Sequence, residues 1–271
     1  MHVPNTGNHV IMRTLKLILA YDGTDYVGWQ RQVNGRSVQG ALELVLSEIE
    51  GEPVNVIGAG RTDAGVHAVG QVASVALSNG IKTDALARAI NGKLPKDIRV
   101  LSVESVSTTF HARYSAKNKT YRYFLNVASV ASPFALRYAW HISSLLDLGA
   151  MRVGGQELTG RHDFSAFQSV GTIVSTPVRT ISSLVVKERS ACHFQDLSDD
   201  STATIVTIDI SADGFLRHMV RAIVGTMVEI GRGRRSTDDI SLVLNSKQRE
   251  RAGPTAPGRG LFLMRVTYGD S

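Results

Sequence analysis

Apolar and polar positions along the first half of the chain follow two spacings in turn. Five segments are short, apolar and typical of strands: 15–22, 54–58, 71–77, 98–106 and 119–127. Val38–Glu50 has its apolar residues at helical spacing directly after Ser37, a suitable N-cap, and 83–91 predicts a shorter helix. The order strand, helix, two strands, helix and two strands predicts an α+β fold.

The second half has the same mixture, without a convincing internal repeat. Three more segments predict strands: 181–188, 204–210 and 261–268. Asp147–Val153 begins like a helix, and we expect Gly154 and Gly155 to break it. Arg217–Ile230 predicts a mostly apolar, buried helix that Gly231 closes.

Composition narrows the class of protein only a little. The chain has 30 Lys and Arg against 24 Asp and Glu, a net charge of +6, which weakly indicates a polyanionic partner. The single cysteine, Cys192, excludes an intramolecular disulfide and any metal site with several cysteines. No apolar run has the length of a membrane-spanning helix, and residues 1–14 lack the apolar centre of a signal peptide. We therefore expect a cytoplasmic protein, with the polar stretch 190–202 as a surface loop.

The block GAGRTDAGVH (58–67) places one carboxylate, Asp63, between an arginine and a histidine on a glycine-rich backbone. Glycine lets a ligand approach the main chain closely, so an acid held there is suited to contact with a substrate. The alternative is a tight turn between two strands in which Asp63 only favours the turn geometry.

Arg221 is unusual because it lies within the predicted buried helix, where an unpaired charge is very costly. It could form a core ion pair with Glu229 or another acid, or extend its side chain to the surface. It could instead face Asp63, and such a pair would keep the carboxylate charged and oriented.

Tyr121 follows the basic residues Arg113, Lys117 and Lys119. It predicts either an ordinary aromatic on a half-buried strand or a platform on which a nucleobase stacks. Three histidines favour local packing or capping on their own: His67, His111 and His218.

Six motifs, in order along the chain, resemble those of the tRNA pseudouridine synthase A family. They are YDGTDYVGWQRQ (21–32), SVQGALE (37–43), GAGRTDAGVHAVGQV (58–72), FHARYSAKNKTYRY (110–123), FLRHMVRAIVG (215–225) and GLFLMRV (260–266). The resemblance runs from about Lys16 to Tyr268, and the block from Arg61 to His67 is its most specific part.

The resemblance implies an enzyme that isomerises uridine to pseudouridine at positions 38 to 40 of the anticodon stem-loop of tRNA, without a metal or an organic cofactor. It implies a homodimer in which each protomer has two similar α/β halves. These halves would share a mixed, mainly antiparallel sheet, with helices on one side and a basic cleft. Residues 15–118 would form the half with the catalytic acid and 119–271 the half that completes the cleft, whereas 1–14 match nothing in the family.

The same resemblance assigns roles to single residues. Asp63 matches the catalytic aspartate, Tyr121 the active-site tyrosine that packs against the target base, and Arg221 the arginine that pairs with the aspartate. Arg61 matches a residue linked to flipping the nucleotide. Two stretches match tRNA-contacting segments: Phe110, His111, Ala112, Arg113 and Tyr114, then Val174, Ser175, Thr176, Pro177 and Val178.

Two positions depart from the family pattern and bear on local RNA contacts. Arg217 stands where many relatives carry an aromatic residue or histidine, and Ala222 where asparagine is usual. The route of Asp63 stays open between attack on C1′, addition to C6 of the ring, and removal of the C2′ proton.

Two other functions compete with the isomerase. One is an RNA-binding or tRNA chaperone protein of the same fold that has lost its chemistry. The other is a metal-dependent nuclease, which needs clustered carboxylates. The neighbourhood of Asp63 offers only Asp22, Asp25 and Asp84, at irregular spacing.

Overall fold

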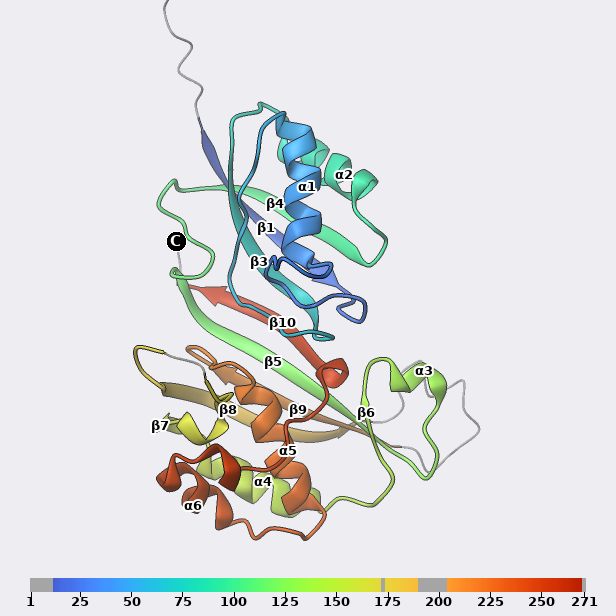
Figure 1. Cartoon of the computed structure of the whole chain (residues 1–271), viewed down its shortest axis with the longest axis vertical. Helices are drawn as coiled ribbons and strands as arrows, with labels where there is room; N and C mark the ends of the chain where they lie inside the picture. The colour runs from blue at the N-terminus through green and yellow to red at the C-terminus, as the bar shows by residue number, and fades with distance from the viewer. Residues whose placement is uncertain (1–11, 172–173, 190–203, 270–271) are drawn as a thin grey trace, which may run out of the picture.

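The computed structural model describes residues 12–171, 174–189 and 204–269. One continuous sheet runs through this part of the chain, in the strand order β4-β1-β3-β10-β5-β9-β8-β7 (Figure 1). The strands are β1 (Arg13–Tyr21), β3 (His67–Leu77), β4 (Ile98–Val106), β5 (Ala116–Val127), β7 (Gly160–Asp163), β8 (Val178–Arg189), β9 (Thr204–Ala212) and β10 (Leu261–Tyr268). Two short strands lie beside this path: β2 (Ile57–Gly58) pairs with β3, and β6 (Trp140–Ile142) pairs with β5.

The last strand joins the two halves of the sheet. β10 pairs in parallel with β3, where Phe262 faces His67, and antiparallel with β5, where Leu261 faces Tyr123. The other neighbours along the path are antiparallel. The expected α+β fold with a mixed, mainly antiparallel sheet is therefore confirmed.

Helices from both halves cover the sheet in Figure 1, where α1 and α2 lie over β1, β3 and β4, and α4 and α5 lie over β8 and β9. Their bounds are α1 (Val38–Glu50), α2 (Thr83–Lys93), α3 (Pro133–Leu136), α4 (Leu148–Glu157), α5 (Met219–Gly231) and α6 (Asp239–Ser246). α1 begins as predicted, because the Ser37 side chain accepts a hydrogen bond from the backbone N–H of Gly40.

Two predictions about local structure are wrong for packing reasons. Residues 54–56 are not strand, because the backbone N–H groups of Val54 and Val56 bind the side chains of Ser47 and Glu43. α4 runs through Gly154 and Gly155 to residue 157. A Cβ atom on Gly155 would lie 2.7 Å from Leu184 Cδ2, so this glycine allows α4 to pack closely on β8.

The predicted helix 217–230 begins later than expected. α5 begins at Met219, and its N-cap residue His218 has the left-handed φ of 63°. Gly231 lies inside the helix, where a Cβ would be 2.7 Å from Met151 Sδ, and Arg232 is the C-cap. The helix is buried as expected, since eleven of its thirteen residues are buried.

Several elements escaped the sequence analysis or fall beside its boundaries. The unpredicted elements include α3, α6, β6 and β7. β3 begins at His67 rather than at residue 71, and β1 already begins at Arg13, within the stretch 1–14. The division at residue 118 stays a prediction, and β5 runs across it. The expected loop 190–202 and Cys192 lie outside the described residues.

Candidate active site

Asp63 lies in the turn between β2 and β3, on a backbone fixed from several directions. The Val66 N–H donates to the Asp63 carbonyl over 3.1 Å, which closes the turn. The Gln71 side chain, fully buried on β3, donates to the Gly60 carbonyl over 2.8 Å and accepts from the Gly60 N–H over 3.3 Å. The carboxylate itself is about a quarter exposed, at 26%. The turn therefore holds a partly exposed carboxylate on a backbone that hydrogen bonds fix in place.

The loop after β1 supports the turn from the other side. Thr62 is buried, and its hydroxyl and Tyr21 Oη are 2.8 Å apart. The Trp29 N–H donates to the Thr62 carbonyl over 3.0 Å, and Gly28 forms an isolated bridge with Asp63. Gly28 has a φ of 113°, and a Cβ there would lie 2.4 Å from the Thr62 oxygen. Only glycine permits this backbone approach.

Arg221, on the first turns of α5, faces Asp63 as one of the two alternatives predicted. Its Nη1 lies 3.2 Å from Asp63 Oδ2, and its Nε donates to the Ala256 carbonyl over 2.7 Å. The Arg221 side chain is 16% exposed, so the pair is partly buried. Glu229, the other predicted partner, binds Arg232 and Arg234 instead, at 3.4 Å each.

The loop 253–260 holds α5 against the Asp63 turn. A Cβ on Gly225 would lie 1.7 Å from the Pro254 oxygen, so loop and helix are in backbone contact. The Gly253 N–H donates to Thr226 Oγ1 over 2.8 Å, and a Cβ on Gly258 would lie 2.5 Å from the Ala64 oxygen. One loop therefore contacts both the helix that carries Arg221 and the turn that carries Asp63.

His218 also reaches Asp63, although its sequence context indicates only local packing or capping. Its Nε2 lies 3.6 Å from the same oxygen, Oδ2, that Arg221 binds. Burial lowers the pKa of His218, Asp63 raises it, and the nearby Arg221, Arg217 and Arg249 lower it further, so the net shift is downward. A positive φ at a histidine is the only local signal, and it is not visible in the sequence.

Tyr121 lies on β5 and is only 6% exposed. Its ring meets the ring of Phe215 edge-on, with 5.1 Å between the centroids. A Cβ atom on Gly60 would lie 3.5 Å from Tyr121 Oη, so the hydroxyl points toward the Asp63 turn. Burial raises the pKa of this tyrosine, and the Asp63 charge adds to the effect. Tyr121 is thus a neutral, packed side chain beside the acid.

His67 packs locally, as its sequence context predicted. It is 1% exposed and stacks on Phe262 at 4.5 Å. Its Nδ1 accepts from the Gly23 N–H over 3.0 Å, and its Nε2 lies 3.1 Å from the Arg259 carbonyl, which only an N–H can bind. Burial lowers the pKa of His67 below its usual value. His67 is therefore a neutral side chain whose hydrogen bond to Arg259 links the end of the turn to the loop 253–260.

The first predicted RNA-contacting stretch, 110–114, lies beside the turn. Ala112 is fully buried and receives a hydrogen bond from Tyr268 Oη over 2.8 Å, while Phe110 packs against Tyr268 with centroids 5.0 Å apart. His111 and Tyr114 stack at 4.3 Å, and Tyr114 is 75% exposed. The stretch is thus anchored by Phe110 and Ala112, His111 is partly buried, and Arg113 and Tyr114 are exposed.

The second stretch, 174–178, leads into β8, where Arg179 donates to the carbonyls of Thr176 and Val178. Val174, Ser175 and Thr176 are exposed, and Pro177 and Val178 are partly buried.

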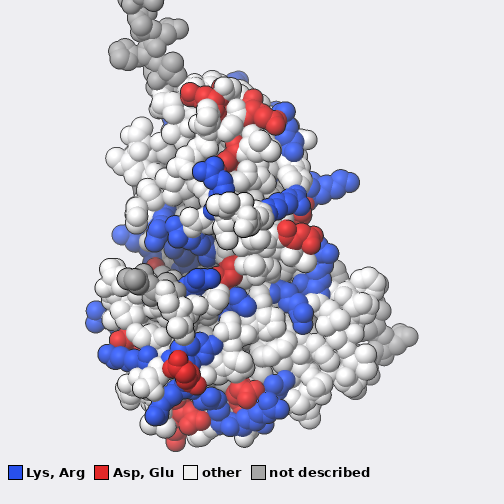
Figure 2. All heavy atoms as spheres, viewed as in Figure 1, with Lys and Arg blue, Asp and Glu red and all other residues white. Residues whose placement is uncertain are grey.

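Four cations near the site have no carboxylate partner within the part of the chain that the structure describes. They are Arg61, Arg113, Lys119 and Arg179. Lys119 lies next to the turn, since a Cβ on Gly60 would be 3.9 Å from its Cδ. Burial, with Arg113 and Arg179 nearby, lowers the pKa of Lys119 to about 8. Figure 2 shows Lys and Arg side chains gathered across the middle of this face, between the two halves.

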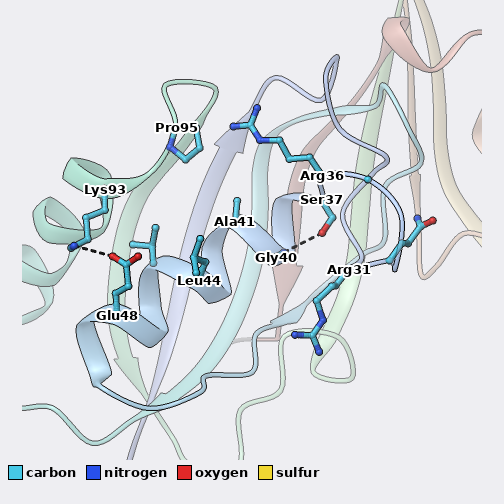
Figure 3. A pocket seen from close by; sticks show the side chains of 12 residues that line it. Arg31, Arg36, Ser37, Gly40, Ala41, Leu44, Glu48, Lys93 and Pro95 are labelled. Carbon is cyan, nitrogen blue, oxygen red and sulfur yellow. Dashed lines mark hydrogen bonds and ion pairs between the residues drawn. The ribbon is translucent and has the colours of Figure 1, made fainter.

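A separate hollow of about 440 Å³ lies along α1 and includes none of these residues (Figure 3). Its three cations are all paired with carboxylates. Arg31 lies 3.3 Å from Glu43, Arg36 lies 3.4 Å from Asp97, and Lys93 lies 2.9 Å from Glu48.

Comparisons with known proteins agree with this geometry. The family model described as "tRNA pseudouridine synthase" matches residues 17–115 and 155–269. The chain belongs to the tRNA pseudouridine synthase family. A "tRNA pseudouridine synthase A" from Acetivibrio thermocellus is 43% identical over 257 residues, covering 95% of this chain and 100% of the relative. Relatives of the same description from Moorella thermoacetica (44% identical, 95% and 100% covered) and Syntrophotalea carbinolica (42%, 95% and 97%) also match.

The tRNA pseudouridine synthase match includes Asp63, the stretch 110–114 and Arg221, whereas Tyr121 lies between its two matched segments. The described residues contain no helix with the length and apolar character that crossing a membrane requires. They also contain no group of three His, Cys, Asp or Glu side chains placed to hold a metal ion.

Proposed function

We propose that this protein isomerises uridine to pseudouridine in tRNA, at positions 38 to 40 of the anticodon stem-loop, with Asp63 as the catalytic carboxylate. The observation that carries the proposal is the contact of Asp63 Oδ2 with Arg221 Nη1 at 3.2 Å, on motifs typical of the family. The relatives' descriptions support the reaction, and the resemblance of the motifs supports the three positions.

The reaction breaks the N1–C1′ bond of uridine, turns the uracil and forms a C5–C1′ bond. The hydrogen on C5 leaves to solvent and N1 gains one, so the net change is an isomerisation. The target base lies in a stem-loop and must first leave the stack, which costs a few kcal/mol. Arg61, which is exposed at the turn, is placed to occupy the vacated space or to hold a phosphate.

Asp63 acts as an ionised carboxylate by any of the three routes: attack on C1′, addition to C6, or removal of the C2′ proton. Arg221 supplies the counter-charge and fixes the carboxylate. Tyr121 lines the space beside the acid and limits how far the freed uracil can move while it turns.

The unpaired cations support a polyanionic substrate. Arg61, Arg113, Lys119 and Arg179 have no carboxylate partner among the described residues, and a phosphate backbone would provide one. Lys119 is held beside two other cations, and an anion bound there would relieve their mutual repulsion.

The test is tritium release from tRNA labelled at uridine C5, for wild type and Asp63→Asn, with EDTA present. We expect release by wild type only, at least about 10⁴-fold faster than by the variant, while both proteins bind tRNA equally well. Release by pure Asp63→Asn at the wild-type rate would falsify the role of Asp63. Bound tRNA without release by either protein would favour the RNA-binding alternative. Cleavage of the tRNA strand by wild type without EDTA, and its loss when EDTA is added, would instead favour the metal-dependent nuclease.

Two finer expectations complete the proposal. We infer a homodimer in the cytoplasm, on the resemblance to the family. Light scattering of the purified protein and fractionation of cells test the two points separately, and a monomer that turns over tRNA would contradict the first.

A further inference from the structure

Both polar side chains that approach Asp63 approach the same oxygen. Arg221 Nη1 is 3.2 Å from Oδ2, and His218 Nε2 is 3.6 Å from Oδ2. No described residue donates a hydrogen bond to Oδ1. The carboxylate is thus held at one oxygen and free at the other, which is the oxygen left for a substrate.

His218 reaches this position through an unusual backbone conformation. It has φ 63° and ψ 1°, one of two positive φ values at non-glycine residues in the described ranges. Such a conformation is uncommon for residues other than glycine, although asparagine, aspartate and histidine adopt it more often than the rest. Its carbonyl still accepts a hydrogen bond from the Ala222 N–H over 2.9 Å. His218 is therefore the N-cap of α5 and at the same time directs its ring at Asp63.

The charges around the ring favour a neutral imidazole. Burial lowers the pKa of His218, and three arginines add to this against the opposing effect of Asp63: Arg221, Arg217 and Arg249. A neutral imidazole carries one N–H, and a carboxylate only accepts hydrogen bonds. The tautomer that can bind Asp63 is therefore the one with its proton on Nε2.

We propose that His218 is a positioning residue, whose Nε2–H joins Arg221 in holding Asp63 Oδ2 so that Oδ1 faces the substrate. The inference rests on the proposed function. The present separation of 3.6 Å is just outside hydrogen-bonding range, and catalytic hydrogen bonds commonly tighten when the substrate binds. A second anchor at Oδ2 prevents rotation of the carboxylate, which one arginine nitrogen alone permits.

The test uses His218→Gly, because glycine adopts φ 63° without strain and removes only the ring. We expect its melting temperature to stay at or above that of wild type, KM for tRNA to stay unchanged, and kcat to fall about 10- to 100-fold. His218→Asn, which tolerates the same conformation and keeps an N–H donor, should recover part of the lost kcat.

Lys247→Gly is the matched control, because Lys247 is the other non-glycine residue with positive φ and pairs with Asp163 instead. Its kcat should equal that of wild type.

Wild-type kcat in His218→Gly would overturn the inference and leave the isomerase intact, as would an equal loss of kcat in His218→Asn and His218→Gly. Absence of turnover in wild type would overturn the proposed function and the inference with it. If His218→Gly fails to fold, His218→Asn decides alone: kcat between about one tenth and all of the wild-type value supports the inference, and a larger loss contradicts it.

Discussion

Two regions of this molecule are rich in arginine and lysine, and they differ in what their cations contact. Along α1, each cation of the hollow has a carboxylate within 3.4 Å, from Glu43, Asp97 or Glu48. Around Asp63, Arg113 and Lys119 have no such partner in the described part of the chain. Arg221 is the arginine that is paired there among the described residues, and its partner is Asp63, the proposed catalytic residue.

The difference separates charge that stabilises the protein from charge available to a ligand. A paired surface cation contributes little free energy and attracts an anion weakly, because its carboxylate opposes the approach. An unpaired cation next to a reactive acid attracts phosphate over several ångströms. Pairing, rather than the number of basic residues, therefore distinguishes the proposed tRNA-binding region around Asp63 from the hollow on α1.

Removing one paired arginine from each region should give the largest contrast. In Arg221→Ala, Asp63 loses its counter-charge, so we expect kcat to fall about 10²- to 10³-fold and the free energy of unfolding to fall by about 2 kcal/mol. Arg36→Ala removes an exposed pair with Asp97, and it should cost less than about 1 kcal/mol with kcat unchanged. Single-turnover kinetics and thermal unfolding measure both. A stable and fully active Arg221→Ala would contradict the pairing.

The lowered pKa of Lys119 gives the next contrast. Below about pH 8 its ammonium is charged and available to a phosphate. As the pH rises through about 8 this charge is lost, well before that of a lysine with the ordinary pKa of 10.5. Between about pH 7 and about pH 9, we expect the tRNA affinity of wild type to fall about fivefold more than that of Lys119→Arg, since arginine stays charged.

Lys93→Arg, in the hollow, is the control and should leave the pH dependence of tRNA affinity as it is in wild type. Binding titrations at constant ionic strength measure the effect. Identical pH dependence in wild type and Lys119→Arg would show that Lys119 does not contact the RNA.

Salt dependence should reveal the smallest contrast. Arg113→Ala removes one unpaired cation, so the slope of log affinity against log salt should become shallower by about one unit, with a loss of affinity of about threefold. Arg31→Ala, whose arginine pairs with Glu43, should leave the slope unchanged. Equal slopes for the two variants would remove the distinction between the regions.

Local patterns predicted the elements whose signals are local. Ser37 marks the start of α1, and β4 and β10 have the bounds that their apolar spacing indicated. The predicted helix break at Gly154 and Gly155 is wrong, because a glycine that breaks a helix and one that lets a helix pack closely look the same in sequence.

The candidate site shows the same limit. The contact of Arg221 with Asp63 was one of two alternatives, since burial of a charge demands a partner but does not name it. His218 could not be found, because its position depends on a positive φ that the sequence does not show. The catalytic roles of Asp63, Tyr121 and Arg221 stay predictions until the variants are measured.

The insertion of β10 between β3 and β5 has a consequence for how the protein is made. A chain leaving the ribosome contains Asp63, Tyr121 and Arg221 well before it contains residue 261. Until β10 arrives, β3 and β5 each lack part of the pairing along one edge, and unpaired edge segments are open to wrong partners. The strand that unites the two halves follows Asp63, Tyr121 and Arg221 along the chain, so the candidate site gains the support of β10 only after all three residues have been made.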